Sequence, residues 1–337
     1  MLCALLLTGC GYLAHVAAGQ AKLLAKRQPV EKVLQDPYLS EQDRQKIRLI
    51  VEVKTFATEY LGLQESNSYS TYVHVDGPYV SYNLSAASKD TLEAYTWRFP
   101  IVGRLPYKGF FRKDNALREE LKLADQGYDT YVRGVRAFST LGYFDDPIVS
   151  CMLTYTDSDL IETIIHELLH LTVWVKGSVS FNESLANFVG EKGTLEFLAL
   201  SHGDSSLEYR HYQDILTDTR LFEKYMQSII SNLEELYGLP IDREEKIHRR
   251  GKLFERARTD YASIISQMKT GLYENFFEWR TLNNAVLLSF RRYHHDTDFF
   301  EEALTKHEGN LRQMIASFKT LRADQIPVTF RMENNHR

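Results

Sequence analysis

The sequence predicts an α+β fold, with strands confined to the N-terminal half and helices dominating the remainder. Residues 69–82 alternate along the chain and are rich in Tyr and Val, which is typical of one or two strands. Residues 130–138 form a further strand candidate. Residues 40–61 have the apolar spacing of an amphipathic helix, and residues 115–126 are also predicted to be helical. The expected sheet is therefore small and N-terminal.

An antiparallel helical hairpin is expected between residues 206 and 270. Two apolar stripes recur there at alternating spacings of three and four residues, and the Gly238-Leu239-Pro240 turn separates them. The stripe residues are Phe222, Met226, Ile229, Leu233 and Leu236, followed by Phe254, Ala257, Tyr261, Ile264 and Met268. Two such stripes can bury each other when the helices pack side by side. Further helices are expected around 275–292 and 297–321.

The 337-residue chain has the composition of a globular protein and is long enough to bury a large core. Hydrophobic residues make up 44% of the chain and charged residues 25%. The net charge of −5 gives no electrostatic reason to expect binding to nucleic acid. We therefore expect no nucleic-acid partner.

Residues 1–10 differ from the rest of the chain. An apolar run at 2–7 leads into Leu7-Thr8-Gly9-Cys10, which is typical of a secretory signal and resembles the lipobox of bacterial lipoproteins. In that motif the chain is cut before the cysteine, whose thiol then carries lipid. No Lys or Arg precedes the run, so the alternative is a short hydrophobic N-terminus with a chance cysteine. No other segment approaches the ~20 apolar residues of a membrane span.

The lipobox interpretation predicts the location of the protein. Lipidated Cys10 would hold the chain in the bacterial cell envelope, at the outer membrane and facing the periplasm. Contact with the membrane would then be through the lipid anchor alone. With Cys3 removed and Cys10 modified, Cys151 would be the one free thiol, so no intrachain disulfide is expected.

The predicted helix at 160–174 contains His166-Glu167-Leu168-Leu169-His170. Positions i and i+4 lie on one face of a helix, so both imidazoles can reach one metal ion. A catalytic Zn²⁺ takes three protein ligands and leaves one position for water. Glu167 projects about 100° from His166 and is near enough to accept a proton from that water. The alternative is a pair of core histidines, but buried polar groups need partners, which a metal and its water would supply together.

Glu183 is the favoured third ligand. It lies on a predicted second helix, and the reversal at 173–180, which contains Gly177, could bring that helix back across the first. Two alternatives remain open. Ser180 and Glu183 also fit a capping box, and Glu191 is a competing carboxylate further along the helix.

The order H-E-x-x-H followed by N-E-x-x-A resembles that of gluzincin peptidases, the thermolysin and zinc-aminopeptidase clan. Further blocks make the chain look like a family of bacterial lipoproteins described as aminopeptidases, over most of its length after Cys10. These blocks are residues 97–103, 106–109, 139–142, 146–147, 181–186 and 283–285. The resemblance implies a zincin-like catalytic core with one Zn²⁺ on His166, His170 and Glu183, and Glu167 as the catalytic residue. It also implies a peptide substrate.

One motif of the family pattern is missing from this sequence, and one residue role has only candidates. The G-x-M-E-N motif, with which zinc aminopeptidases hold the free amine of a substrate, is absent, so exopeptidase and endopeptidase activity both stay open. Gluzincins also use a Tyr or His from a later helix to stabilise the oxyanion. Tyr293 is the first candidate and His294 the second, although a packing role for Tyr293 is an alternative. Residues 139–142 lie where gluzincins place the edge strand that pairs with substrate.

Three regions are expected along the chain. These are a signal peptide at 1–10, a zincin-like catalytic region at 11–200, and a helical region at 201–330 that could be integrated with the catalytic one. The expected function is zinc-dependent peptide hydrolysis, of aminopeptidase type. The alternative is a lipid-anchored metal-binding scaffold without turnover, with the 206–270 hairpin as its partner surface. The sequence makes no prediction of oligomeric state.

Overall fold

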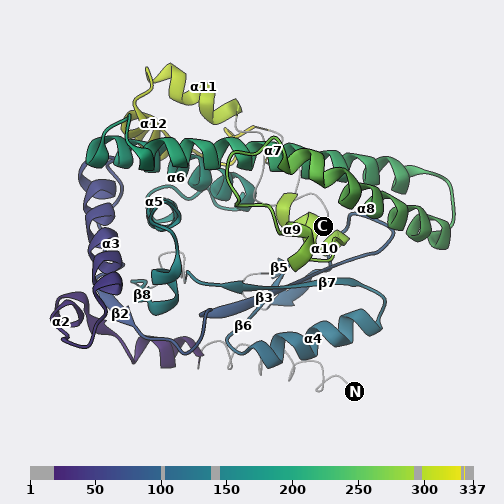
Figure 1. Cartoon of the computed structure of the whole chain (residues 1–337), viewed down its shortest axis with the longest axis horizontal. Helices are drawn as coiled ribbons and strands as arrows, with labels where there is room; N and C mark the ends of the chain where they lie inside the picture. The colour runs from purple at the N-terminus through teal and green to yellow at the C-terminus, as the bar shows by residue number, and fades with distance from the viewer. Residues whose placement is uncertain (1–18, 100–102, 138–144, 292–297, 328–329, 331–337) are drawn as a thin grey trace. The chain divides into compact units, whose positions relative to one another are not determined.

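The computed structural model describes residues 19–99, 103–137, 145–291, 298–327 and 330 (Figure 1). Its named strands all precede residue 150, and long helices follow, which agrees with the predicted α+β class. The chain divides into two compact units, each built from three separate segments. The first unit comprises residues 1–22, 81–135 and 213–292, and the second comprises 23–80, 136–212 and 293–337.

The first unit contains a three-stranded antiparallel sheet in the order β6-β3-β7. Its strands are β3 (Ser81–Ala87), β6 (Lys108–Phe110) and β7 (Asp129–Val135). Helix α4 (Lys113–Asp125) packs on one face, where Leu84 and Leu123 share an apolar cluster. Helix α10 packs on the opposite face, where Ala87 meets Leu288 (Figure 1). The predicted helix at 115–126 and strand at 130–138 correspond to α4 and β7. A separate two-stranded pair joins β4 (Trp97–Phe99) and β5 (Gly103–Leu105).

The predicted hairpin is confirmed by α7 (Leu207–Gly238) and α8 (Arg243–Ile265), which run antiparallel (Figure 1). Residues 239–242 join them. All ten predicted stripe residues belong to one apolar cluster, because the two helical faces bury each other. Leu233, for example, is fully buried. The short helices α9 (Phe276–Trp279) and α10 (Asn284–Arg291) continue the chain.

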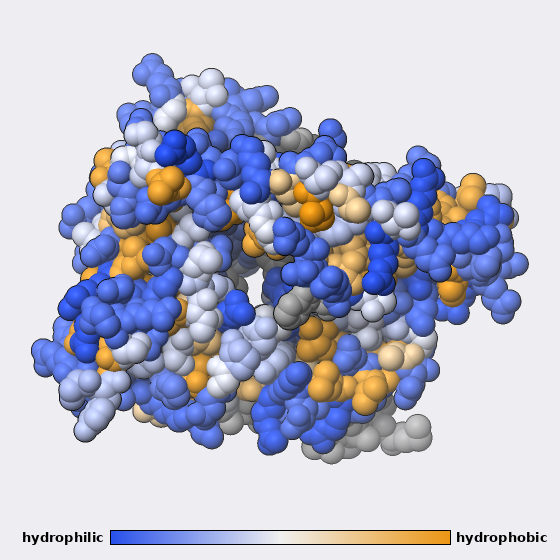
Figure 2. All heavy atoms as spheres, in the orientation of Figure 1, coloured by the Kyte–Doolittle hydropathy of each residue, from blue (hydrophilic) through white to orange (hydrophobic). Residues whose placement is uncertain are grey.

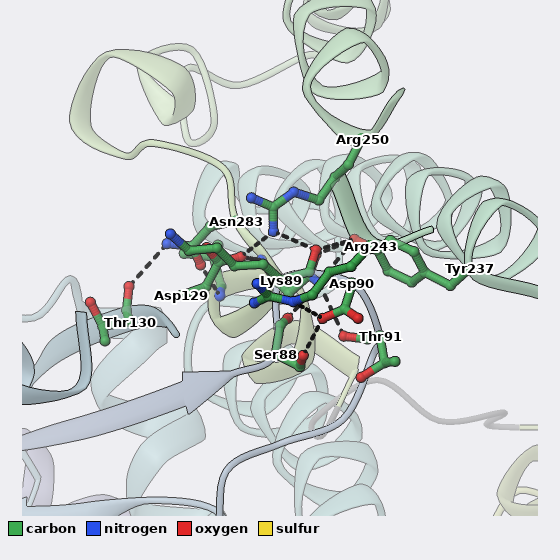
Figure 3. Close-up of polar contacts among 12 residues, drawn as sticks. Ser88, Lys89, Asp90, Thr91, Asp129, Thr130, Tyr237, Arg243, Arg250 and Asn283 are labelled. Carbon is green, nitrogen blue, oxygen red and sulfur yellow. Dashed lines mark hydrogen bonds and ion pairs between the residues drawn. The ribbon is translucent and has the colours of Figure 1, made fainter. Parts of the chain in front are cut away.

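A buried polar network holds α10 and the 88–91 loop to the start of β7 (Figure 3). The backbone N–H of Asn284 donates to Asp129 Oδ2 at 2.9 Å, and its side-chain amide donates to the carbonyls of Ser88 and Thr91. Arg250 Nη1 of α8 donates to the same Asp129 carboxylate at 2.6 Å. Most of the buried polar groups in this network have hydrogen-bond partners. The network therefore fixes the 88–91 loop, β7, α8 and α10 in one arrangement. The 283–285 block of the family resemblance thus has a structural role.

The second unit contains a three-stranded sheet in the order β1-β2-β8. Strand β1 (Gln28–Pro29) pairs antiparallel with β2 (Thr71–Val73), which pairs in parallel with β8 (Ile148–Val149). The predicted strands at 69–82 are therefore two short strands that belong to different units, β2 here and β3 in the first.

Helices make up most of the second unit. They are α2 (Val30–Leu34), α3 (Glu41–Glu59), the 3₁₀ helix η1 (Ser150–Thr154), α5 (Asp157–Thr172), α6 (Val179–His202), α11 (Asp298–Lys306) and α12 (Leu311–Phe318). Helix α3 starts as its sequence predicts, because Ser40 Oγ accepts from the Asp43 N–H at 3.0 Å. Its buried face includes Ile47, Ile50 and Val53. Helix α3 packs against α5 and α6.

The surface and the chain ends bear on the remaining predictions. Hydrophilic residues cover most of the face shown in Figure 2, and apolar residues occur there in small groups. None of the helices that the structure describes has the length and apolarity needed to cross a bilayer.

Cys10 lies outside the described residues, and Cys151 is a buried free thiol. The interleaved units differ from the contiguous regions 11–200 and 201–330, which stay a prediction.

Candidate metal centre

Helix α5 begins where the sequence predicts. Thr156 is its N-cap, and its Oγ1 accepts from the Asp159 N–H at 3.1 Å. Asp157 and Asp159 place negative charge in the first turn, where the helix dipole favours it. The apolar side of the helix is buried, including Ile164, Ile165, Leu168 and Leu169. This burial fixes the rotation of α5 and therefore the direction of both histidines.

The three predicted ligands converge in the second unit. His166 Nε2 lies 3.1 Å from His170 Nε2, and the two rings are nearly perpendicular at 89°. Glu183 reaches them from α6, with Oε2 3.5 Å from His166 Nε2 and Oε1 3.6 Å from His170 Nε2. One ligand atom from each residue lies within 4.8 Å of the others, so the group can hold a metal ion.

The spacing of these atoms fits Zn²⁺. Tetrahedral zinc bonds of about 2.0–2.1 Å place neighbouring donor atoms about 3.4 Å apart. The two imidazole nitrogens are 3.1 Å apart, and each lies 3.5 or 3.6 Å from a different oxygen of the Glu183 carboxylate. Two histidines and a glutamate are also a donor set that catalytic zinc sites use, with one position left for water.

The charges around the histidines favour a cation. Burial by itself would lower the pKa of His166, but the hydrogen bond to Glu183 and the charges of Glu167 and Glu183 raise it above its usual value. Burial and the neighbouring His166 lower the pKa of His170. A proton and a metal ion would therefore compete for His166, and binding of the metal would release that proton.

Glu167 has a free acceptor beside the histidines. Its Oε2 is buried and has no hydrogen-bond partner among the described residues. A buried carboxylate oxygen without a partner costs free energy, which a water or substrate proton would recover. Glu167 Oε2 is thus a buried acceptor that no described group satisfies.

Tyr69 is a neighbour of this site that sequence reasoning missed. Its side chain is buried, and burial, followed by the charges of Glu167 and Asp146, raises its pKa well above the usual value. The phenol therefore stays neutral near Glu167. Its backbone has the unusual φ of 63°, held by donation from the Tyr69 N–H to the Asp146 carbonyl and from the Asp146 N–H to Ser68 Oγ. No local pattern marks such a residue, because Asp146 is far away in sequence.

The structure bears on both alternatives for Glu183. Helix α6 starts at Val179 with Ser178 as N-cap, so Ser180 lies inside the helix and the capping-box alternative is wrong. Glu191 is not part of the group that can hold a metal, and its charge instead acts on Tyr212. The carboxylate at the histidines is that of Glu183.

The α5–α6 connection is closed by Asn182, whose side chain is almost fully buried. The Val175 N–H donates to Asn182 Oδ1 at 2.8 Å, and Asn182 Nδ2 donates to the Val175 carbonyl at 2.9 Å. Gly177 has a φ of 80°, which suits glycine in the tight turn between them. Because Asn182 directly precedes Glu183, this pair of hydrogen bonds places the start of α6 beside the histidines.

A glycine and an alanine let α6 approach α5 closely. A Cβ on Gly190 would lie 3.2 Å from Glu162 Cγ and 3.3 Å from the Glu162 carbonyl oxygen. Ala186, whose small side chain was expected to allow this approach, is fully buried. The Gly190 position carried a sequence signal, a glycine inside a helical pattern, that the sequence analysis did not use.

Several predicted site residues lie outside the described part of the chain. These are Tyr293, His294 and the edge-strand block at 139–142. Their roles stay predictions.

Comparison with known proteins adds the family. No curated protein and no solved structure matches the chain. Residues 11–329 match a protein family described as "Putative aminopeptidase". Because this match spans nearly the whole chain, the protein belongs to that aminopeptidase family.

Proposed function

We propose that the chain is a zinc-dependent peptidase of aminopeptidase type. The observation that carries the proposal is the convergence of His166, His170 and Glu183 beside the unpaired carboxylate oxygen of Glu167. Membership of an aminopeptidase family supplies the class of substrate, a peptide. Glu167 favours turnover over a metal-binding scaffold, because a structural zinc site has no use for a carboxylate beside an open position.

The residues divide the chemistry between them. His166, His170 and Glu183 would hold the metal, which would lower the pKa of a bound water and polarise the scissile carbonyl. Glu167 would accept the proton of the attacking water and later donate it to the leaving amine. Tyr293, or His294 in its place, would donate a hydrogen bond to the oxyanion.

We also propose that the protein works in the bacterial cell envelope, on a lipid attached to Cys10. The support is the Leu7-Thr8-Gly9-Cys10 sequence after an apolar run. Mass analysis of the mature chain tests it, since a lipidated N-terminus would begin at Cys10 and carry acyl groups.

Metal removal tests the proposed activity. Dialysis of the full chain against dipicolinate should abolish hydrolysis of short peptides, and added Zn²⁺ should restore it. Peptides with a free N-terminus should be cleaved, and the same peptides with an acetylated N-terminus should stay intact. Internal cleavage of the acetylated peptides would change the assignment to an endopeptidase. Full activity in protein shown to be free of metal would refute the zinc mechanism.

A further inference from the structure

The connection between α5 and α6 turns a tryptophan outward beside the metal centre. Val173 has φ −132° and ψ 118°, an extended conformation in which successive side chains point to opposite sides. Val173 and Val175 are buried, with exposed fractions of 3% and 2%. Trp174 between them is 41% exposed. Burial of its two neighbours thus holds the indole at the surface.

The indole lies against one of the proposed metal ligands. The Trp174 and His170 ring centroids are 5.5 Å apart, with an interplanar angle of 76°. A peptide spans about 3.3–3.6 Å per residue, so a residue next to a carbonyl at the metal could place its side chain on this indole. The Trp174 indole is therefore within reach of a substrate residue next to the scissile bond.

The backbone that carries Trp174 is held on its C-terminal side, at Val175. Asn182 pairs with both backbone groups of Val175, and the Ser178 N–H donates to the Val175 carbonyl at 3.2 Å. An exposed aromatic ring on such a fixed segment loses little conformational freedom when a ligand binds. Large exposed aromatics on rigid backbone are typical of recognition sites.

From this geometry we infer that Trp174 contacts the substrate and selects peptides with an aromatic or large aliphatic residue next to the scissile bond. This rests on the proposed peptidase function and adds the class of side chain that the site prefers. Aromatic rings attract one another in stacked and edge-to-face arrangements, and the exposed indole offers a surface for both.

The test compares wild type, Trp174→Ala and Trp174→Phe on four peptides. They differ only at the residue next to the scissile bond, which is Phe, Leu, Ala or Ser. In Trp174→Ala, kcat/KM should fall about tenfold for the Phe and Leu peptides and by less than about twofold for the Ala and Ser peptides. Trp174→Phe should keep most of the preference. Leu200→Ala removes another exposed apolar side chain of the same unit, 60% exposed, and should change nothing.

A binding measurement separates recognition from turnover. Calorimetry of the Phe peptide with zinc-loaded Glu167→Gln should give a dissociation constant about tenfold lower than with Glu167→Gln/Trp174→Ala. Equal loss of kcat/KM for all four peptides would overturn the inference. So would a fall in zinc affinity in Trp174→Ala with an unchanged preference, because Trp174 would then only support His170. A zinc-loaded wild type that cleaves none of the peptides would instead overturn the proposed function, and this inference with it.

Discussion

Glu183 brings its two carboxylate oxygens to 3.5 and 3.6 Å from the two imidazoles. Glu183→Ala should therefore weaken zinc binding by more than about 100-fold, beyond the loss typical of outer partners of a metal site. Competition with a chromogenic chelator measures the dissociation constant.

Glu191→Ala is the matched control, since it removes the rival carboxylate from the same helix. Its zinc affinity should stay within about threefold of wild type. Similar losses in both variants would contradict the assignment of Glu183 as ligand.

Glu196 of α6 gives the stability of the protein a pH dependence of its own. Burial raises its pKa from 4.5 to about 7. Between these two values the folded protein keeps a proton that the unfolded chain releases, so the free energy of unfolding falls as pH rises through this interval. Glu196→Gln should remove that fall and melt at a higher temperature than wild type at pH 8.

Thermal melts of the metal-free protein between pH 4.5 and 8 measure the effect. Glu208→Gln, at an exposed position, should follow the wild-type curve. A wild-type curve that Glu196→Gln reproduces across this range would show that Glu196 contributes nothing to the pH dependence.

Sequence reasoning reached some of these residues and missed others for a physical reason. His166, Glu167 and His170 lie within five consecutive residues of one helix, so helical geometry alone brings them together. Glu183 could be predicted as the third ligand only with alternatives beside it. Its position relative to the histidines depends on how the chain turns at Gly177. Tyr69 has no local signal, since its neighbours Asp146 and Glu167 come from distant parts of the chain.

At the scale of elements, the α5–α6 connection determines whether Glu183 meets the histidines. Asn182→Ala would leave the backbone N–H of Val175 buried and unpaired, at a cost of about 1–3 kcal/mol, while the Ser178 N–H would still donate to the Val175 carbonyl. We expect a lower melting temperature and zinc affinity weakened by about 10–100-fold, as for other outer partners of metal sites. Calorimetric melts and chelator competition on the same protein measure both quantities.

Asn310→Ala is the control for stability alone. Asn310 caps α12 through the Gln313 N–H, and loss of the cap should cost about 1 kcal/mol. Its melting temperature should fall while its zinc affinity stays at the wild-type value. An Asn182→Ala protein that melts lower but binds zinc as tightly as wild type would show that the connection does not position Glu183.

Helices were easier to predict than sheets for a related reason. The stripes of α7 and α8 repeat every three or four residues, so the pattern itself predicts both the helices and the faces that pack. Strand β2 pairs with β8 across Tyr72 and Ile148, which are far apart in sequence. Such pairings depend on tertiary contacts, so periodicity could not show that residues 69–82 divide between two sheets.

At the scale of the whole molecule, the three residues that can hold a metal ion lie entirely within the second unit. His166, His170, Glu183 and Tyr69 all belong to the segments 23–80 and 136–212. The polar network around Asn284 and the α7–α8 cluster belong to the first unit. Since each unit is assembled from separated segments, neither is expected to fold as a simple truncation, and the experiments above use the full chain.

We propose above all that Glu167 acts as a base beside a zinc ion held by His166, His170 and Glu183. The most direct test measures metal content and peptide hydrolysis for wild type and Glu167→Gln side by side. We predict one zinc ion per chain in both proteins, with hydrolysis lost in Glu167→Gln alone. Equal hydrolysis by the two proteins, or a wild type without stoichiometric metal, would contradict the account.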